Sequence, residues 1–208
     1  MLRLAVFVGT RGRGSNLMAI QAAILQSRLD AKIVAVVGSQ PGAPALERAR
    51  EAGLPTCVVS PKTLGDGYEG ALLETLRAMD ADTIALAGYL RMLPANLVQE
   101  YRHRILNTHP ALLPAFGGKG MYGHHVHEAV LAYGAKVSGC TVHFVDEEYD
   151  TGPVIVQRAV PVLEGDTPDS LAARILPVEH AAFVEALALL AEGRLSVEGR
   201  RVRIRPRP

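Results

Sequence analysis

The sequence has no tryptophan, only two cysteines, and no excess of charge of either sign. Its 22 basic and 21 acidic residues give a net charge of +1, so nothing indicates a nucleic-acid or membrane surface. No apolar run approaches the ~20 residues that a membrane-spanning helix requires. The apolar run at the N-terminus ends at Val8, too early for a signal peptide. We therefore expect a cytoplasmic protein without a nucleic-acid or membrane partner.

The two cysteines, Cys57 and Cys140, lie within β-rich runs. We expect two buried free thiols in a cytoplasmic protein, with a disulfide or a catalytic thiol as the alternatives. The 208 residues are 49% hydrophobic and 21% charged, as is typical of an ordinary globular protein. This length is enough for one domain with a well-buried core.

Apolar runs and helical periodicities alternate through the first half of the chain. The strand-like runs are continuously apolar, as in sheets that are covered on both faces. This rhythm predicts an α/β fold with an open, mostly parallel sheet and helices on both faces. The predicted strands are residues 2–8, 32–37, 56–59 and 83–87, and the predicted helices are residues 17–26, 45–51, 68–79 and 95–103, with Asp66 as the cap of the third helix.

The second half of the chain has a different pattern. A short strand at 105–106 leads into the run NTHPALLP, and a glycine-rich loop is predicted at 114–123. Two closely spaced strands favour an antiparallel pair, joined by a loop at 146–152. The predicted elements are a helix at 124–132, strands at 137–145 and 153–162, a helix at 168–191 that Pro177 should kink or split, and a hairpin-like pair around Glu198-Gly199 that ends in a basic, partly disordered tail.

The loop GTRGRGSN joins the first strand to the first helix. Glycines allow the backbone to approach a ligand, and a helix N-terminus offers free N–H groups to a phosphate. Gly14, Ser15 and Asn16 are therefore candidate phosphate ligands. The second strand ends without an acidic residue for a ribose diol, which favours a monophosphate over a dinucleotide. The alternative is a glycine turn that only connects the strand to the helix.

Three polar residues form the strongest candidate for chemistry: Asn107, His109 and Asp150. Asn107 and His109 are two apart at the end of a strand, so their side chains point to the same side. Asp150 lies in a loop that ends in Gly-Pro. An amide and a protonated imidazole can stabilise a developing oxyanion, and a carboxylate can keep that imidazole charged and move a proton. A structural role for this trio is the alternative, and the lack of a second well-placed His or Cys ligand argues against a metal site.

The sequence gives weaker evidence of a functional role for four other histidines and for Arg91. His124, His125 and His127 look like metal ligands, but without an obvious carboxylate or cysteine partner we expect a solvated or capping role. Strand alternation places His143 on one face of the sheet, where it lines the candidate site without an evident chemical role. Arg91 follows an apolar strand, and its spacing does not decide between a helix-edge charge and a site residue.

Five motifs cover nearly the whole chain: GSNL at 14–17, LAGYLRMLP at 86–94, LNTHPALLPAF at 106–116, GCTVHFVDEEYDTGPVI at 139–155, and EH at 179–180. On these motifs the chain resembles the folate-dependent formyltransferases, and among them the phosphoribosylglycinamide formyltransferases of purine synthesis. The resemblance implies a Rossmann-like formyltransferase fold, with residues 1–208 as a single domain. About residues 1–103 would form a phosphate-binding half and about 104–208 a catalytic and folate-binding half.

The resemblance also implies an activity: transfer of the formyl group of 10-formyltetrahydrofolate to the amine of 5-phosphoribosylglycinamide in de novo purine biosynthesis. The formyl donor is a co-substrate, no metal is required, and the protein would be a monomer or a homodimer. The alternatives are a formyltetrahydrofolate deformylase, which uses water as the acceptor, and a non-catalytic nucleotide-binding module.

Site residues follow from the same resemblance. Asn107, His109 and Asp150 would be catalytic, and Gly14, Ser15, Asn16 and Glu179 would contact the ribonucleotide. The folate-binding residues would be Leu90, Arg91, Met92, Leu93, Asn107, Asp146, Glu147, Glu148, Tyr149 and Asp150. The chain departs from the family at Gly65-Asp66-Gly67, where members often carry a basic residue that helps to bind the cofactor. It also carries Arg11 and Arg13 before the phosphate loop, which can strengthen phosphate binding or remain solvent charges.

Overall fold

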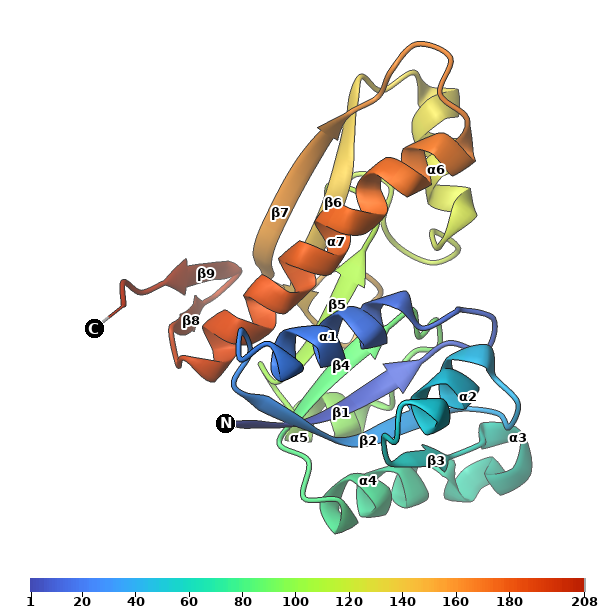
Figure 1. Cartoon of the computed structure of the whole chain (residues 1–208), viewed down its shortest axis with the longest axis vertical. Helices are drawn as coiled ribbons and strands as arrows, with labels where there is room; N and C mark the ends of the chain where they lie inside the picture. The colour runs from blue at the N-terminus through green and yellow to red at the C-terminus, as the bar shows by residue number, and fades with distance from the viewer. Residues whose placement is uncertain (208) are drawn as a thin grey trace. The chain divides into compact units, whose positions relative to one another are not determined.

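The structure is a computed structural model that describes residues 1–207. These residues divide into two compact units, Met1–Leu106 and Asn107–Pro208, and each unit is described by itself. That the two halves form a single domain stays a prediction. The order of elements is shown along the chain in Figure 1.

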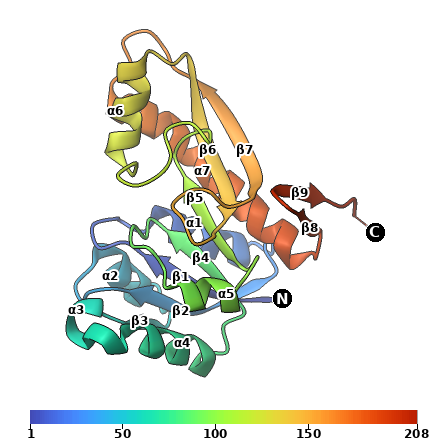
Figure 2. The ribbon, with the colours of Figure 1, turned by 180° about the vertical axis from the view of Figure 1, so that it is seen from behind.

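The first unit is built on a parallel sheet with the strand order β3-β2-β1-β4. Residues Leu4–Val8 of β1 and all of β4 are buried, as expected for strands covered on both faces. Helices α1 and α4 lie on opposite sides of this sheet (Figures 1 and 2). The elements are β1 (Leu2–Val8), α1 (Ser15–Leu25), β2 (Ala31–Gly38), α2 (Pro44–Glu51), β3 (Thr56–Val58), α3 (Pro61–Leu64), the 3₁₀ turn η1 (Gly65–Gly67), α4 (Tyr68–Ala78), β4 (Thr83–Ala87) and α5 (Ala95–Glu100).

The second unit contains the antiparallel part of the fold. Strands follow in the order β5-β6-β7-β9-β8, in which β6 pairs with β7 and β8 with β9 in antiparallel fashion. Helix α7 packs along β6 and β7 (Figure 1). The predicted combination of parallel strands with antiparallel C-terminal strands is confirmed. The elements are β5 (Ile105–His109, which begins in the first unit), α6 (His124–Tyr133), β6 (Val137–Phe144), β7 (Val154–Pro161), α7 (Pro168–Ala191), β8 (Leu195–Glu198) and β9 (Arg201–Ile204).

The prediction that Pro177 would split the long helix is wrong, because α7 runs unbroken from Pro168 to Ala191. Proline removes one backbone donor, which leaves the carbonyl of Ala173 without its usual partner. Both Ala173 and Pro177 are exposed, so water can hydrate that carbonyl, while the opposite face of the helix is buried at Leu171 and Ile175. Packing of that face outweighs the local cost of the proline.

Asp66 is not the cap of the helix that ends near Met79. The residue lies inside η1, and the N-cap position of α4 is Gly67, with no side-chain hydrogen bond to the helix end. Since the 3₁₀ turn runs directly into α4, Asp66 already has a helical backbone, whereas a capping side chain needs an extended one. The expected extension of α5 to His103 is also wrong, because His103 has φ 58° and ends the helical path.

The C-terminal segment forms a hairpin around Glu198-Gly199, as the sequence predicted. Arg203 pairs with Glu198, and both Arg194 and Arg207 pair with Glu192. That the tail is partly disordered stays a prediction.

Candidate active site

The last three residues of β5 carry two of the three predicted site residues. Asn107 is half-buried and His109 is almost fully buried. Because successive side chains of a strand alternate, these two share one face, and Thr108 between them points to the other. The site therefore begins at the carboxyl end of a sheet strand, where open α/β sheets hold their ligands.

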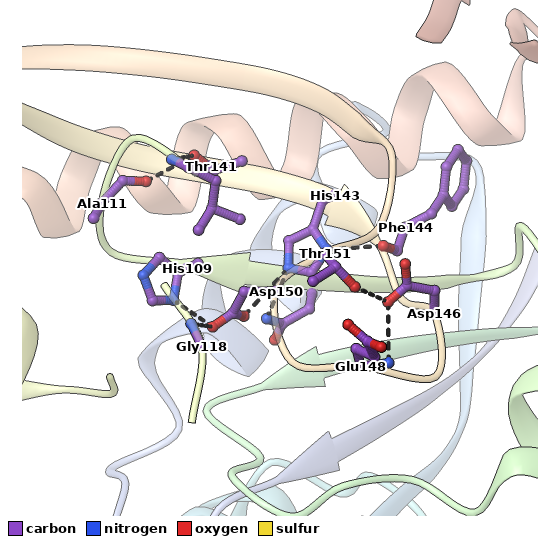
Figure 3. Close-up of polar contacts among 12 residues, drawn as sticks. His109, Ala111, Gly118, Thr141, His143, Phe144, Asp146, Glu148, Asp150 and Thr151 are labelled. Atoms are coloured by element: carbon purple, nitrogen blue, oxygen red, sulfur yellow. Dashed lines mark hydrogen bonds and ion pairs between the residues drawn. The ribbon is translucent and has the colours of Figure 1, made fainter. Parts of the chain in front are cut away.

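Asp150 lies beside His109, as the trio requires. Its Oδ2 atom is 3.5 Å from His109 Nδ1 and accepts a hydrogen bond of 2.9 Å from the backbone N–H of Gly118 (Figure 3). The other ring nitrogen, His109 Nε2, is 2.8 Å from the carbonyl oxygen of Phe116. A carbonyl can only accept, so the hydrogen of the neutral ring is on Nε2, and Nδ1 presents a lone pair to Asp150.

The loop between β6 and β7 holds Asp150 in an uncommon backbone conformation, with φ 58°. Aspartate is among the few residues that adopt the left-handed region readily. Asp146 closes the loop by accepting hydrogen bonds from Thr151 Oγ1 at 2.7 Å and from the Glu148 N–H at 3.3 Å (Figure 3). Arg200, at the tip of the β8–β9 hairpin, donates to the carbonyl of Thr151 at 2.7 Å. Hydrogen bonds of the residues before and after Asp150 therefore fix the loop that carries it.

Gly152 ends this loop for a steric reason. A Cβ atom at this position would overlap the carbonyl oxygen of Phe144, which belongs to the end of β6. The backbone of Phe144 also donates its N–H to the carbonyl of Pro153 at 2.9 Å. Only glycine allows the Asp150 loop to approach β6 this closely.

His143 contacts two of the three predicted site residues, which the sequence did not reveal. Its Nε2 atom is 3.1 Å from Asn107 Nδ2 and 3.7 Å from Asp150 Oδ1, and its Nδ1 atom is 2.8 Å from the carbonyl of Phe144. The side chain is fully enclosed, with 2% exposure. Strand alternation could place His143 on the correct face, but the pairing with Asn107 depends on strand register, which the pattern does not contain.

The turn that follows His109 is anchored to β6 and β7 through one buried hydroxyl. Thr141 Oγ1 donates to the carbonyl of Ala111 at 2.7 Å and accepts from the N–H of Leu113 at 3.0 Å. Gln157 Nε2 in turn donates to Thr141 Oγ1 and to the carbonyl of Leu113. These bonds satisfy the turn's backbone groups and hold the strand end that carries His109.

Burial lowers the pKa of His109 below its ordinary value, although Asp150 and the carbonyl of Phe116 act in the opposite direction. Asp150 acts as expected in favouring the charged imidazole, but removing the ring from water costs the charged form more than the carboxylate returns. For Asp150, burial raises the pKa, but the N–H of Gly118 donates to the carboxylate, and the pKa lies below its ordinary value. At neutral pH the pair consists of a carboxylate and a neutral imidazole.

His127 provides a test of this burial effect away from the trio. It is 5% exposed, and burial, together with His124 and His109, lowers its pKa. Below about pH 6.5 the unfolded chain binds a proton at this position that the folded chain binds less readily, so stability falls as pH falls. We expect His127→Leu to show a smaller drop in Tm than the native chain between about pH 7.5 and about pH 5.5. Equal drops in the two proteins would contradict a depressed pKa.

In the first unit, the predicted phosphate residues lie at the start of α1. Gly14 is the N-cap residue, with φ 73°, and no side chain caps the helix. The backbone N–H groups of the first turn therefore lie at an uncapped, positive helix end. A Cβ on Gly14 would crowd Ala45 of α2, which gives the glycine a packing reason as well. Arg48 donates to the carbonyl of Arg13 at 3.3 Å and links α2 to the loop.

The residues predicted to contact the folate and the ribonucleotide differ in their exposure to solvent. Leu90 and Met92 are about half exposed, at 53% and 50%, whereas Leu93 is buried. Glu179 is buried on α7, close enough to Cys140 to contribute to the raised pKa of that thiol. The roles of these residues, of Arg91, and of Asp146 to Tyr149 stay predictions.

The predicted capping or solvated role fits His124 and His125, which are exposed, but not His127, which is buried on α6. Carboxylates that the sequence did not suggest lie beside the first two, with Glu128 near both and Asp169 near His124. Among the described residues, no three His, Cys, Asp or Glu side chains are grouped so as to hold a metal ion.

Both cysteines are free, and Cys140 is buried as expected, while Cys57 is only half-buried.

Comparison with known proteins identifies the family of this chain. Residues 2–187 match the family model described as formyl transferase. The chain belongs to the formyl transferase family. Its sequence is 39% identical over 192 residues to the phosphoribosylglycinamide formyltransferase of Bacillus subtilis, covering 91% of this chain and 95% of that protein. The crystal structure of glycinamide ribonucleotide transformylase 1 from Symbiobacterium toebii matches with a TM-score of 0.90 and 42% identity, over 99% of this chain and 95% of the other.

A chloroplastic relative extends beyond this chain. The phosphoribosylglycinamide formyltransferase of Arabidopsis thaliana is 45% identical over 197 residues, which are 93% of this chain but 66% of that protein. The formyl transferase chain thus spans slightly less than two thirds of the plant protein's length. Within residues 1–207, none of the helices combines the length and the apolarity that crossing a membrane would require.

Proposed function

We propose that this formyl transferase moves the formyl group of 10-formyltetrahydrofolate to the amine of 5-phosphoribosylglycinamide. The products would be formylglycinamide ribonucleotide and tetrahydrofolate, in de novo purine biosynthesis. The observation that carries the proposal is the pairing of buried His109 with Asp150, 3.5 Å apart, near Asn107 at the end of a sheet strand. Relatives named for this activity, with 39% identity over nearly their full length, support it.

The reaction begins when the amine nitrogen attacks the formyl carbon, and the formyl oxygen becomes an oxyanion. His109 Nε2–H, which donates to the Phe116 carbonyl in the structure, would donate to that oxygen instead. The Asn107 amide would supply a second donor. The segment around Phe116 and Gly118 must therefore release the two catalytic side chains before they can act on substrate.

The amine proton then moves to Asp150, through water if the two are not in contact. The lone pair of His109 Nδ1 is 3.5 Å from Asp150 Oδ2, so a proton that arrives at the carboxylate can pass to the imidazole. The ring becomes an imidazolium while the oxyanion exists, and its positive charge stabilises that anion. When the carbonyl re-forms, N10 of the folate leaves and takes the proton, which balances the transfer.

The uncapped start of α1 would bind the phosphate of the ribonucleotide through backbone N–H groups and the Ser15 hydroxyl. We expect Ser15→Ala to raise the KM for the ribonucleotide by about tenfold, because a hydrogen bond to a charged group is lost, with little change in kcat. Steady-state kinetics with each substrate varied in turn measures this. An effect confined to the KM for the folate would contradict the phosphate role.

The other proposed contacts complete the binding of the substrates. Glu179 would contact the ribonucleotide, and Leu90 to Leu93, Asn107 and Asp146 to Asp150 would hold the pterin of the folate. No metal is needed for this chemistry, because the protein's own donors and acceptors supply each step. A cytoplasmic location and a monomeric or homodimeric state stay predictions, since the relatives include chloroplastic enzymes.

Direct detection of the product tests the proposal. The protein is incubated with 10-formyltetrahydrofolate carrying a ¹³C-formyl group and with 5-phosphoribosylglycinamide, and the ribonucleotide fraction is analysed by mass spectrometry. We expect the labelled formyl group on the ribonucleotide. Labelled formate in its place would identify water as the acceptor and would favour a deformylase, while recovery of both substrates unchanged would favour a non-catalytic binding module.

A further inference from the structure

His143 is a buried side chain that contacts both Asn107 and Asp150, and the reaction above does not use it. Its Nδ1 atom faces the Phe144 carbonyl at 2.8 Å. Because a carbonyl oxygen only accepts hydrogen bonds, the ring hydrogen of neutral His143 is on Nδ1 (Figure 3). Nε2 is then an acceptor, not a donor.

An accepting Nε2 decides how the Asn107 amide is turned. Only the NH₂ end of the amide can donate to Nε2, at 3.1 Å, because the oxygen end would place two lone pairs against each other. The same Nε2 atom is 3.7 Å from Asp150 Oδ1, so the NH₂ end of Asn107 is directed toward the Asp150 side of the site. One N–H of that end bonds to His143, and the second remains available.

We propose that His143, as the Nδ1–H tautomer, is a positioning residue that keeps the donor end of Asn107 turned toward the reacting formyl oxygen. Without it the amide can rotate and present its oxygen to a developing anion, which repels that anion instead of stabilising it. The positioning role of His143 rests on the proposed formyl transfer. The tautomer of His143 and the orientation of the Asn107 amide do not depend on that proposal. The Phe144 carbonyl and the close approach of Gly152 hold the histidine in place.

A double-mutant cycle tests the coupling to Asn107. His143→Phe keeps an aromatic ring but removes the acceptor, and we expect kcat to fall by about ten- to a hundredfold with little change in either KM. His143→Gln restores an acceptor near the Nε2 position and should recover most of kcat. In an Asn107→Ala background, His143→Phe should lower kcat by less than about twofold, because the amide it positions is gone.

The same substitution in a Ser15→Ala background is the matched control. Ser15 belongs to the other compact unit and to ribonucleotide binding, so there His143→Phe should have its full effect. Full additivity with Asn107→Ala, or an unchanged kcat in His143→Phe, would overturn the proposal. Circular dichroism and Tm confirm that each variant is folded.

A measurement without substrate separates this inference from the proposed function. ¹⁵N NMR of the native protein labelled in its histidines reports which ring nitrogen of His143 carries hydrogen at neutral pH. We expect a protonated Nδ1 and a bare Nε2, with the Nε2 signal assigned by its loss in His143→Gln. A protonated Nε2 would overturn the inference even if formyl transfer is observed. A bare Nε2 in a protein without formyl transfer would instead refute the proposed function alone.

Discussion

Replacing His109 by alanine is expected to lower kcat at least about a hundredfold while the protein stays folded. The substitution removes the Nε2–H donor to the oxyanion and also the Nδ1 atom that receives the proton from Asp150. Asn107→Ala removes the other donor and should act to a similar extent. Single-turnover formyl transfer, measured with both substrates saturating, isolates the chemical step from binding.

A surface histidine provides the control for this result. His124 is 49% exposed and lies on α6, outside the hydrogen bonds of the trio, so His124→Ala should keep kcat close to that of the native chain. A folded His109→Ala protein with near-native kcat would show that the imidazole is structural. Loss of folding in His109→Ala alone would leave Asn107→Ala, at a half-buried position, as the deciding variant.

Replacing Asp150 by asparagine is expected to be as damaging as loss of His109. The amide keeps the shape of the carboxylate and can still accept the N–H of Gly118. The amide cannot take a proton at neutral pH. The variant side chain therefore could neither accept the amine proton nor pass it on to His109, and the imidazolium would not form. We therefore expect a fall in kcat of at least about a hundredfold with little change in Tm.

Asp169→Asn makes the same chemical change at a carboxylate that is 91% exposed. It should leave kcat unchanged, which controls for a general loss of negative charge. An Asp150→Asn enzyme with kcat within a few-fold of native would contradict proton transfer through this carboxylate. A raised KM for the folate with kcat unchanged would indicate a binding role instead.

Local patterns predicted most of the fold, because each element carries its own signal. Continuous apolar runs marked the buried strands, and helical periodicity marked α1, α4 and α7. The errors arose where a neighbouring segment overrides the local preference. Pro177 is tolerated because the packed face of α7 outweighs one lost hydrogen bond, and Asp66 is not a cap because a 3₁₀ turn precedes α4.

The candidate site could be predicted as far as its side chains have local signatures. The spacing of Asn107 and His109 placed both on one face of a strand, and the Gly-Pro exit of the next loop pointed to Asp150. Sequence could not show that backbone groups of Phe116 and Gly118 bond to His109 and Asp150, because every residue carries the same amide. It also could not show that burial lowers the pKa of His109, since burial depends on the whole unit.

The dependence of folate release on the acceptor tests the central claim most directly. An absorbance assay follows 10-formyltetrahydrofolate, or its dideaza analogue, with and without 5-phosphoribosylglycinamide. Transfer by Asn107, His109 and Asp150 predicts release of the deformylated folate only when the ribonucleotide is present, at a rate that saturates with its concentration. Release at the same rate without the ribonucleotide, or no release under either condition, would contradict formyl transfer to this amine.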